Sequence, residues 1–284
     1  MNAPIVVLSG GGAKAAAHAG AVRALTEREI IPSRYVATSV GAVVGAALAS
    51  GMDADEIVRR LLHEAPQGFR PHPLAPFIGL YLKGLARSHS FREALERVVP
   101  ARTFAELKTP LTVTAVDLDS MKLVLFGTGG EDVPLLDALA ASCALPPYFA
   151  PVLLDGRRLA DGGVLGHLPL DGVGDSAGRP VIAIDAGPSL DDGAPQRPQA
   201  GGPALVRYVD EAIGILMAQV ASEQVQRWRR ERGALMYVRP RLERNATFRT
   251  DRVRVYADEG YLAMRAELDA LDSSGPSGRL PVSP

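Results

Sequence analysis

The stretch from residue 5 to residue 41 reads IVVLSGGGAKAAAHAGAVRALTEREIIPSRYVATSVG, and it decides the fold. A short apolar strand over 5–8 leads into three glycines, and residues 14–29 then have a helical composition. A second short strand over 35–38 leads into a helix of small residues over 41–50. Strands that alternate with helices in this way indicate a parallel sheet that is covered by helices.

The rest of the chain continues this alternation. Further strands are expected at 111–116 and 122–126, at 152–154 and 158–160 around Asp155-Gly156, and at 181–185 and 235–238. Further helices are expected to start at capping boxes over 53–56, 90–93 and 103–106, and to cover 135–144, 205–230 and 258–271. We therefore expect one α/β domain over 1–271, with a mostly parallel central sheet between two layers of helices, and a flexible tail over 272–284.

Composition and charge exclude several classes of protein. The 284 residues are 47% hydrophobic, which is enough for one large core. Lys and Arg total 31 against 32 Asp and Glu, and this balance gives no electrostatic basis for binding nucleic acid. The single cysteine, Cys143, excludes an intramolecular disulfide and leaves too few thiols for a zinc or iron–sulfur site. With no paired ligands at metal-binding spacing, we expect neither a metal nor a cofactor.

The N-terminal residues do not resemble a signal peptide. They contain no basic region, and their apolar run ends at Leu8. No stretch of the sequence approaches the roughly 18 consecutive apolar residues of a membrane span. We therefore expect a cytoplasmic protein, and peripheral contact with the inner membrane stays open.

Gly10, Gly11 and Gly12 stand between the first strand and the first helix, and Ala13 and Lys14 follow them. Consecutive glycines allow the backbone amides to point into one concavity. Such a loop is suited to an anion, either a phosphate or the oxyanion of an acyl-transfer intermediate. A close strand-to-helix turn without chemistry is the alternative.

Two nucleotide-binding motifs are similar to this loop, but each lacks a required residue. The pattern Gly10-x-Gly12-x-x-Ala15 matches the dinucleotide fingerprint, yet the second strand ends in Ala37-Thr38-Ser39 without the acid that would bind a ribose. A P-loop requires Gly-Lys-Ser/Thr, whereas Lys14 lies between alanines. The sequence therefore favours neither nucleotide site.

Ser39 follows the second strand in the sequence Ala37-Thr38-Ser39-Val40-Gly41. This pattern resembles the nucleophile elbow Gly-x-Ser-x-Gly, a strained turn that presents a serine above the edge of a sheet. Ala37 replaces the first glycine, which is the smallest change that a side chain allows. A serine that only caps the following helix is the alternative.

The third motif is Asp161-Gly162-Gly163, in which a strand delivers an aspartate into a glycine turn, and alone it would be an ordinary Asx turn. In chain order, however, the glycine loop, the serine elbow and this turn together resemble the patatin-like phospholipases, which are serine lipid acyl hydrolases with a Ser–Asp dyad. The likeness extends to His18 and Gly20 on the first helix, to the segment 141–151, and to Gly260-Tyr261 near the C-terminus.

The resemblance implies a patatin-like domain in which Ser39 is the nucleophile and Asp161 is its base. The substrate would be a phospholipid or another fatty-acyl ester, hydrolysed through an acyl-enzyme by a phospholipase A, lysophospholipase or esterase. An apolar setting from Leu159, Ala160 and Val164 would raise the pKa of Asp161 from its usual value of about 3.9 and make it a better base. The resemblance assigns the oxyanion hole to Gly10, Gly11 and Gly12, and supporting positions to Lys14, Gly41, Gly162 and Gly163.

Three residues depart from the family's pattern, because Ala15 and Ala37 replace glycines and His167 replaces an asparagine. Ala15 is expected to narrow the oxyanion pocket. His167 follows Asp161 closely enough to leave a Ser–His–Asp triad open, although a spacing of six residues suits a triad poorly. An acyltransferase with the same acyl-serine and a non-catalytic lipid-binding protein of the same fold stay open as well.

Residues 66–87 lie between the elbow and the central strands, and they combine prolines with apolar side chains. A lipid hydrolase needs an apolar surface through which an acyl chain can leave a bilayer. We therefore expect Phe77, Tyr81 and their neighbours to cover the mouth above Ser39 and to contact membranes.

Overall fold

The fold is that of a computed structural model, which describes residues 3–64, 90–146, 148–190, 204–243 and 249–273. These residues form a mixed α/β structure with one eight-stranded sheet. The strands are β1 Ile5–Leu8, β2 Arg34–Thr38, β3 Leu111–Asp117, β4 Lys122–Gly127, β5 Val152–Leu154, β6 Arg157–Asp161, β7 Val181–Ile184 and β8 Met236–Val238.

The order of the strands in the sheet is β5-β6-β3-β2-β1-β7-β8, with β4 paired to β3 off this path. Strands β3, β2, β1, β7 and β8 pair in parallel, whereas the pairs β3–β4, β3–β6 and β5–β6 are antiparallel. The predicted mostly parallel sheet is thus confirmed, and its antiparallel part is the edge that carries Asp161. The strands expected at 111–116 and 122–126 pair as the antiparallel hairpin β3–β4, and those expected around Asp155-Gly156 pair as β5–β6.

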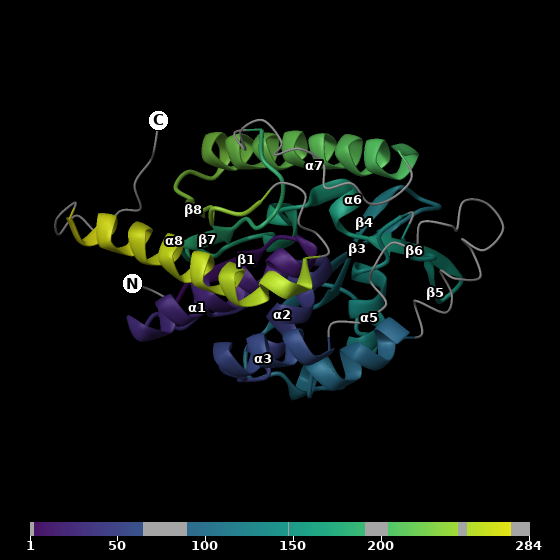
Figure 1. The fold of residues 1–284 in the computed structure, drawn as a ribbon, viewed down its shortest axis with the longest axis horizontal. Coiled ribbons are helices and arrows are strands. Elements are labelled where there is room, and N and C mark those ends of the chain that lie inside the picture. The colour runs from purple at the N-terminus through teal and green to yellow at the C-terminus, as the bar shows by residue number, and fades with distance from the viewer. Residues whose placement is uncertain (1–2, 65–89, 147, 191–203, 244–248, 274–284) are drawn as a thin grey trace.

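Helices cover both faces of the sheet, with α7 on one side and α1, α2, α3 and α8 on the other (Figure 1). The α-helices are α1 Ala16–Glu27, α2 Ser39–Ala49, α3 Ala54–Glu64, α5 Leu135–Ser142, α6 Gly163–Gly166, α7 Ala204–Glu231 and α8 Val253–Ser273, and residues 90–98 are also helical. Short 3-10 turns are η1 Gly12–Ala15, η2 Phe104–Glu106, η3 Leu170–Val173 and η4 Thr250–Arg252.

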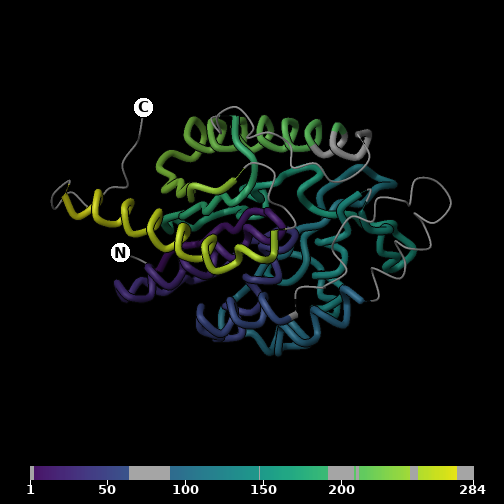
Figure 2. Tube along the Cα trace, viewed as in Figure 1, coloured from purple at the N-terminus to yellow at the C-terminus, as the bar shows by residue number. Residues whose placement is uncertain are grey.

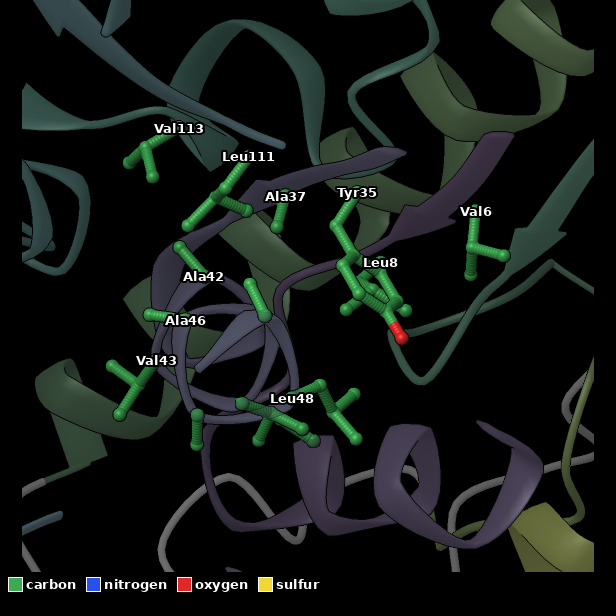
Figure 3. Packing of buried hydrophobic residues seen from close by; sticks show 14 of the residues in the cluster. Val6, Leu8, Tyr35, Ala37, Ala42, Val43, Ala46, Leu48, Leu111 and Val113 are labelled. Atoms are coloured by element: carbon green, nitrogen blue, oxygen red, sulfur yellow. The ribbon is translucent and has the colours of Figure 1, made fainter. Parts of the chain in front are cut away.

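The two faces of the sheet are both apolar, as expected for a parallel sheet between helices. Val6 and Leu8 of β1 belong to the larger core against α1, α2 and α8, whereas Ile5 and Val7 belong to the core against α7. Figure 3 shows α2 packed against strand residues of the larger core, with Ala42 on the side of the helix that faces them. The small residues of α2 allow this helix to lie close to the strands that carry the loop ends.

Helix α8 runs beside α1, and both helices carry residues of the family-like pattern (Figure 2). A Cβ on Gly20 would lie 1.8 Å from the carbonyl oxygen of Ala257, and a Cβ on Gly260 would lie 1.9 Å from that of Ala17. Only glycine therefore fits at either position. Helix α8 is longer at both ends than the predicted helix over 258–271. It begins at Val253, and its last residue, Ser273, lies within the predicted tail.

Candidate active site

Ser39 lies at the junction of β2 and α2, in the strained conformation that an elbow requires. Its φ of +55° falls in the left-handed region, which is uncommon for a residue with a Cβ. Gly41 allows the helix to start here, because a Cβ at this position would lie 2.1 Å from the carbonyl oxygen of Ser9. The turn therefore presents the Ser39 side chain at the carboxyl end of β2, beside the glycine loop after β1.

The backbone of the elbow is held by Ser142 at the end of α5. The Ser39 amide donates to Ser142 Oγ over 2.8 Å, and the Ser142 hydroxyl donates to the carbonyl of Thr114 over 2.7 Å. Ser142 is fully buried. One hydroxyl thus joins the strained turn to the central strand β3.

Asp161 ends β6, and the structure brings it against Ser39 although 122 residues separate the two in the chain. The Ser39 hydroxyl donates to Asp161 Oδ2 over 2.6 Å. The other carboxylate oxygen, Oδ1, accepts the amide of Gly163 over 2.7 Å. The carboxylate is therefore oriented by its own turn, with one oxygen directed at the serine.

Burial raises the pKa of Asp161 to about 6, although the hydrogen bonds from Ser39 and Gly163 and the nearby His167 oppose this rise. The side chain is 1% exposed, between the buried residues Leu159 and Ala160 and the glycine turn. The predicted apolar setting is found for these two neighbours, but Val164 is 45% exposed and does not contribute to it. A pKa of about 6 leaves Asp161 ionised at neutral pH and makes it a stronger base than an exposed aspartate.

Gly162 and Gly163 are both closely packed, but against different neighbours. A Cβ on Gly162 would lie 2.4 Å from Thr38 Oγ1 and 2.5 Å from Thr114 Oγ1, so only glycine allows the turn to lie against β2 and β3. A Cβ on Gly163 would lie 3.0 Å from Asp161 Oδ1, a tight contact at the carboxylate itself.

The glycine loop turns beside Ser39, with positive φ at Gly11 (+153°) and Gly12 (+57°). The Gly10 amide donates to the carbonyl of His167 over 3.1 Å, so it is already occupied. Within the described part of the chain, the amides of Gly11 and Gly12 donate to no protein acceptor. Lys14, which follows in η1, is 2% exposed.

His18 supports this loop from the first helix. Its Nε2 lies 2.8 Å from the carbonyl oxygen of Ser9, which only accepts, so Nε2 carries the proton. Burial lowers the pKa of His18 to about 4 despite this hydrogen bond, and the ring is therefore neutral. The structure thus gives His18 a supporting contact to the backbone before the glycine loop, away from the Ser39 hydroxyl.

His167 lies beside the glycine loop, but its ring is hydrogen-bonded to Asp185 and not to Asp161. Its Nε2 is 3.1 Å from Asp185 Oδ1, at the end of β7. The order of Ser39, Asp161 and His167 in the sequence therefore does not correspond to one hydrogen-bonded chain. Instead, the Ser39 hydroxyl donates directly to the carboxylate of Asp161, with no imidazole between them.

Cys143 follows Ser142 and carries a thiol, a second type of nucleophile near the elbow. Burial, and then the charge of Asp161, raise the pKa of this thiol well above the usual value. A buried neutral thiol is a poor nucleophile, which leaves the Ser39 hydroxyl as the candidate nucleophile of this site.

Sequence reasoning missed two residues of the site, Ser142 and Asp185. Ser142 stood in the family-like segment 141–151, but nothing in its neighbourhood indicated that its hydroxyl would reach Ser39. Asp185 ended a predicted buried strand, and a charged residue at the carboxyl end of a parallel strand was the signal that could have placed it near the loops.

A sequence model of the patatin-like phospholipase family matches residues 6–173, which include the glycine loop, Ser39 and Asp161. The chain belongs to this family. The match ends shortly after the Asp-Gly-Gly turn, so it covers the strands that carry the glycine loop, Ser39 and Asp161, but not β7 and Asp185.

Several relatives of this patatin-like chain carry names that give no activity. An uncharacterized NTE family protein of Mycobacterium tuberculosis is 34% identical over 191 residues, which cover 66% of this chain and 51% of that protein. The protein YqhO of Bacillus subtilis is 29% identical over 206 residues, with 64% and 70% covered. Human patatin-like phospholipase domain-containing protein 6 is 27% identical over 188 residues, with 66% and 13% covered. The chain spans about half the length of its mycobacterial relative.

Among solved structures, VipD from Legionella pneumophila is similar in fold, with a TM-score of 0.50 and 18% identity over 95% of this chain and 67% of that one. No helix in the described ranges is both long and apolar enough to cross a membrane. The predicted cap over 66–87, with Phe77 and Tyr81, lies outside the described residues.

Proposed function

We propose that this chain is a serine lipid acyl hydrolase in which one domain over residues 1–271 cleaves fatty-acyl esters, with Ser39 as nucleophile and Asp161 as base. The observation that carries the proposal is the 2.6 Å hydrogen bond between the Ser39 hydroxyl and the buried carboxylate of Asp161. Membership of the patatin-like phospholipase family supports a lipid substrate.

In the acylation step, Ser39 Oγ attacks the carbonyl carbon of the ester, and its proton passes to Asp161 Oδ2 along the existing hydrogen bond. The carbonyl oxygen becomes an oxyanion. When the tetrahedral intermediate collapses, the bond to the alcohol breaks, and Asp161 returns the proton to the departing alkoxide. The acyl group remains on Ser39.

In the deacylation step, a water molecule attacks the acyl carbon while Asp161 accepts its proton. The second intermediate releases the fatty acid, and the proton of Asp161 returns to Ser39 Oγ. The raised pKa of Asp161, about 6, makes its carboxylate a stronger base toward Ser39 and water, and its acid form can still protonate the departing alkoxide.

The candidate oxyanion donors are reduced to two amides. We assign them to Gly11 and Gly12, because the Gly10 amide already donates to His167. A pair of preorganised amides beside the nucleophile is the arrangement that stabilises a developing oxyanion. Gly10 instead fixes the position of the loop.

The proposal is tested with a chromogenic short-chain ester and a fluorophosphonate probe on the purified protein. The wild type is expected to turn over the ester and to be labelled on Ser39, whereas Ser39→Ala loses roughly a thousandfold or more in kcat and is not labelled. Ser50→Ala is the matched control, because the Ser50 hydroxyl only donates to the Ala46 carbonyl of the same helix. Labelling of another serine, or an active Ser39→Ala protein, contradicts the assignment.

The same assay separates the hydrolase from its two rivals. An acyltransferase is identified if added alcohol receives the acyl group as a new ester while the chromogenic leaving group is released as fast as before. A folded wild type that neither turns over the ester nor reacts with the probe contradicts both enzyme functions and favours the non-catalytic alternative. Release of free acid at an undiminished rate supports the hydrolase.

A further inference from the structure

A second buried polar cluster lies behind the glycine loop, and the proposed mechanism does not use it. Its centre is Asp185, which follows β7 and is 1% exposed. Asp185 Oδ1 accepts the Gly187 amide (2.9 Å) and contacts His167 Nε2 (3.1 Å). Asp185 Oδ2 accepts the Tyr237 hydroxyl (2.8 Å) and forms an ion pair with Arg239 Nη1 (3.2 Å).

These contacts keep Asp185 ionised inside the protein. Burial acts to raise its pKa, but the hydrogen bond from His167 and the charges around it, among them Arg239, hold that pKa well below its usual range. A carboxylate only accepts hydrogen bonds, so His167 Nε2 carries a proton and donates a hydrogen bond to Asp185. This fixes the orientation of the imidazole ring.

The space around His167 is built for this orientation. A Cβ on Gly187 would lie 1.6 Å from His167 Nε2, so only glycine leaves room for the ring beside Asp185. His167 is itself 2% exposed. The ring is thus confined between the end of β7 and the glycine loop.

His167 contacts the loop in two ways. Its carbonyl accepts the Gly10 amide over 3.1 Å. Its ring edge lies against Gly10, because a Cβ built on Gly10 would be 3.2 Å from His167 Nδ1 and 3.3 Å from the Ser39 Cβ. The imidazole and Ser39 therefore flank the same side of Gly10.

We infer that His167, oriented by Asp185, is a positioning residue that holds the glycine loop in register with Ser39. It acts through Gly10, and it places the following amides of Gly11 and Gly12 where the oxyanion forms. The inference rests on the proposed hydrolase function. Because preorganised amides act on the transition state, loss of this support lowers kcat and leaves KM nearly unchanged.

The central test compares two replacements of His167. Leu fills a similar volume without a hydrogen-bond donor, whereas Asn retains a side-chain N–H for Asp185. We expect His167→Leu to lower kcat on a soluble ester by roughly 30-fold or more with KM within about twofold, a loss that approaches the roughly 100-fold found when one oxyanion donor is removed outright. His167→Asn is expected to recover at least about tenfold of that loss. A His167→Leu protein whose melting temperature falls while kcat stays within about threefold of wild type overturns the inference, since its role is then purely structural.

A double-mutant cycle tests whether Asp185 and His167 act as one unit. We expect Asp185→Asn to lower kcat, and the double variant with His167→Leu to be no worse than the less active of the two single variants. Asp117→Asn is the matched control, because Asp117 is another largely buried carboxylate that accepts hydrogen bonds, from Asp119 and Ser120, in the turn after β3. Its effect on kcat is expected to be small and additive with His167→Leu. Full additivity for Asp185 contradicts the pairing.

Hydrogen–deuterium exchange of the peptide over residues 9–15 provides a readout that does not depend on turnover. Exchange is expected to rise in His167→Leu and to return toward the wild-type rate in His167→Asn. Unchanged exchange in His167→Leu overturns the positioning role even if ester turnover is absent. Failure of the proposed function shows differently, as a wild type that is not labelled on Ser39.

Discussion

The amide of Ser39 donates to the hydroxyl oxygen of Ser142 over 2.8 Å, and this bond joins a strained turn to the end of a neighbouring helix. The φ of +55° at Ser39 carries a cost of order 1–3 kcal/mol for a residue with a Cβ. Surrounding contacts must over-determine such a conformation, and Ser142, which also donates to Thr114, is one of them. The position of the predicted nucleophile thus depends on a residue outside the three sequence motifs.

Ser142→Ala removes the acceptor and leaves the Ser39 amide buried without a partner. We expect a loss of about 1–3 kcal/mol in the free energy of unfolding, the cost of an unsatisfied buried donor, together with roughly a tenfold loss in kcat as the elbow relaxes. Chemical denaturation and ester kinetics measure the two effects. Ser33→Ala is the control. Ser33 directly precedes β2, at the end of the strand away from Ser39, and its hydroxyl donates to the Pro4 carbonyl. This variant is expected to leave kcat unchanged. Equal kcat in the two variants would show that the elbow needs no support from Ser142.

The rate of acylation should follow the ionisation of Asp161. Its pKa is raised to about 6, and only the carboxylate form can accept the Ser39 proton. We therefore expect kcat/KM on a neutral ester to rise tenfold per pH unit below about pH 6 and to level off above it. A profile that levels off already near pH 4 would contradict the buried base.

Asp161→Asn should separate activity from stability. The folded pKa of about 6 lies above the usual value of 3.8, so this group stabilises the fold below about pH 4 and loses that contribution as the pH rises through 6. At pH 8 the wild type therefore carries a buried charge that asparagine lacks. We expect the variant to lose most activity and to gain about 1–3 kcal/mol in stability relative to wild type between pH 4 and pH 8. Denaturant unfolding at both pH values measures this, and a variant that is less stable at pH 8 than at pH 4, relative to wild type, refutes the sign.

His18 should make the protein sensitive to acid. Its folded pKa of about 4 lies below the usual value of 6.5, so its contribution to stability is present above pH 6.5 and is lost as the pH falls through 4. The loss attributable to this ring is at most about 3 kcal/mol. His18→Gln retains an N–H for the Ser9 carbonyl, and we expect a flatter dependence of the unfolding free energy on pH. His63→Gln, at an exposed histidine on α3, is expected to keep the wild-type dependence.

Gly162→Ala tests the contact between the Asp-Gly-Gly turn and the sheet. The added Cβ would meet the Thr38 and Thr114 hydroxyls at 2.4 and 2.5 Å, so the turn must shift and carry Asp161 with it. We expect a loss of about 1–3 kcal/mol in stability and a large loss in kcat. Gly214→Ala in α7 is the opposite case, because a Cβ there meets nothing within 4 Å, and it is expected to stabilise the protein by about 0.5–1 kcal/mol. Thermal unfolding of both variants decides between these outcomes.

The sequence alone determined the elements that rest on local chemistry. Glycines marked the loop, the elbow and the turn, and a Cβ has no room at Gly41 of the elbow or at Gly162 of the turn. Asp53 accepts the Glu56 amide over 2.8 Å, as the predicted helix cap requires. The hairpin strands and the parallel units followed from hydrophobic patterns and turn residues. Helix ends were less well predicted, since the last helix begins at Val253 instead of Asp258.

Only the tertiary structure decided which polar groups become partners. Asp161 reaches Ser39 across 122 residues because β6 pairs with β3 and β3 pairs with β2. His167 pairs with Asp185, although Asp161 is closer to it in the sequence. The physical reason is that local propensity acts over a few residues, whereas these contacts are set by strand order. Burial, which raises the pKa of Asp161 and lowers that of His18, likewise exists only once the layers have packed.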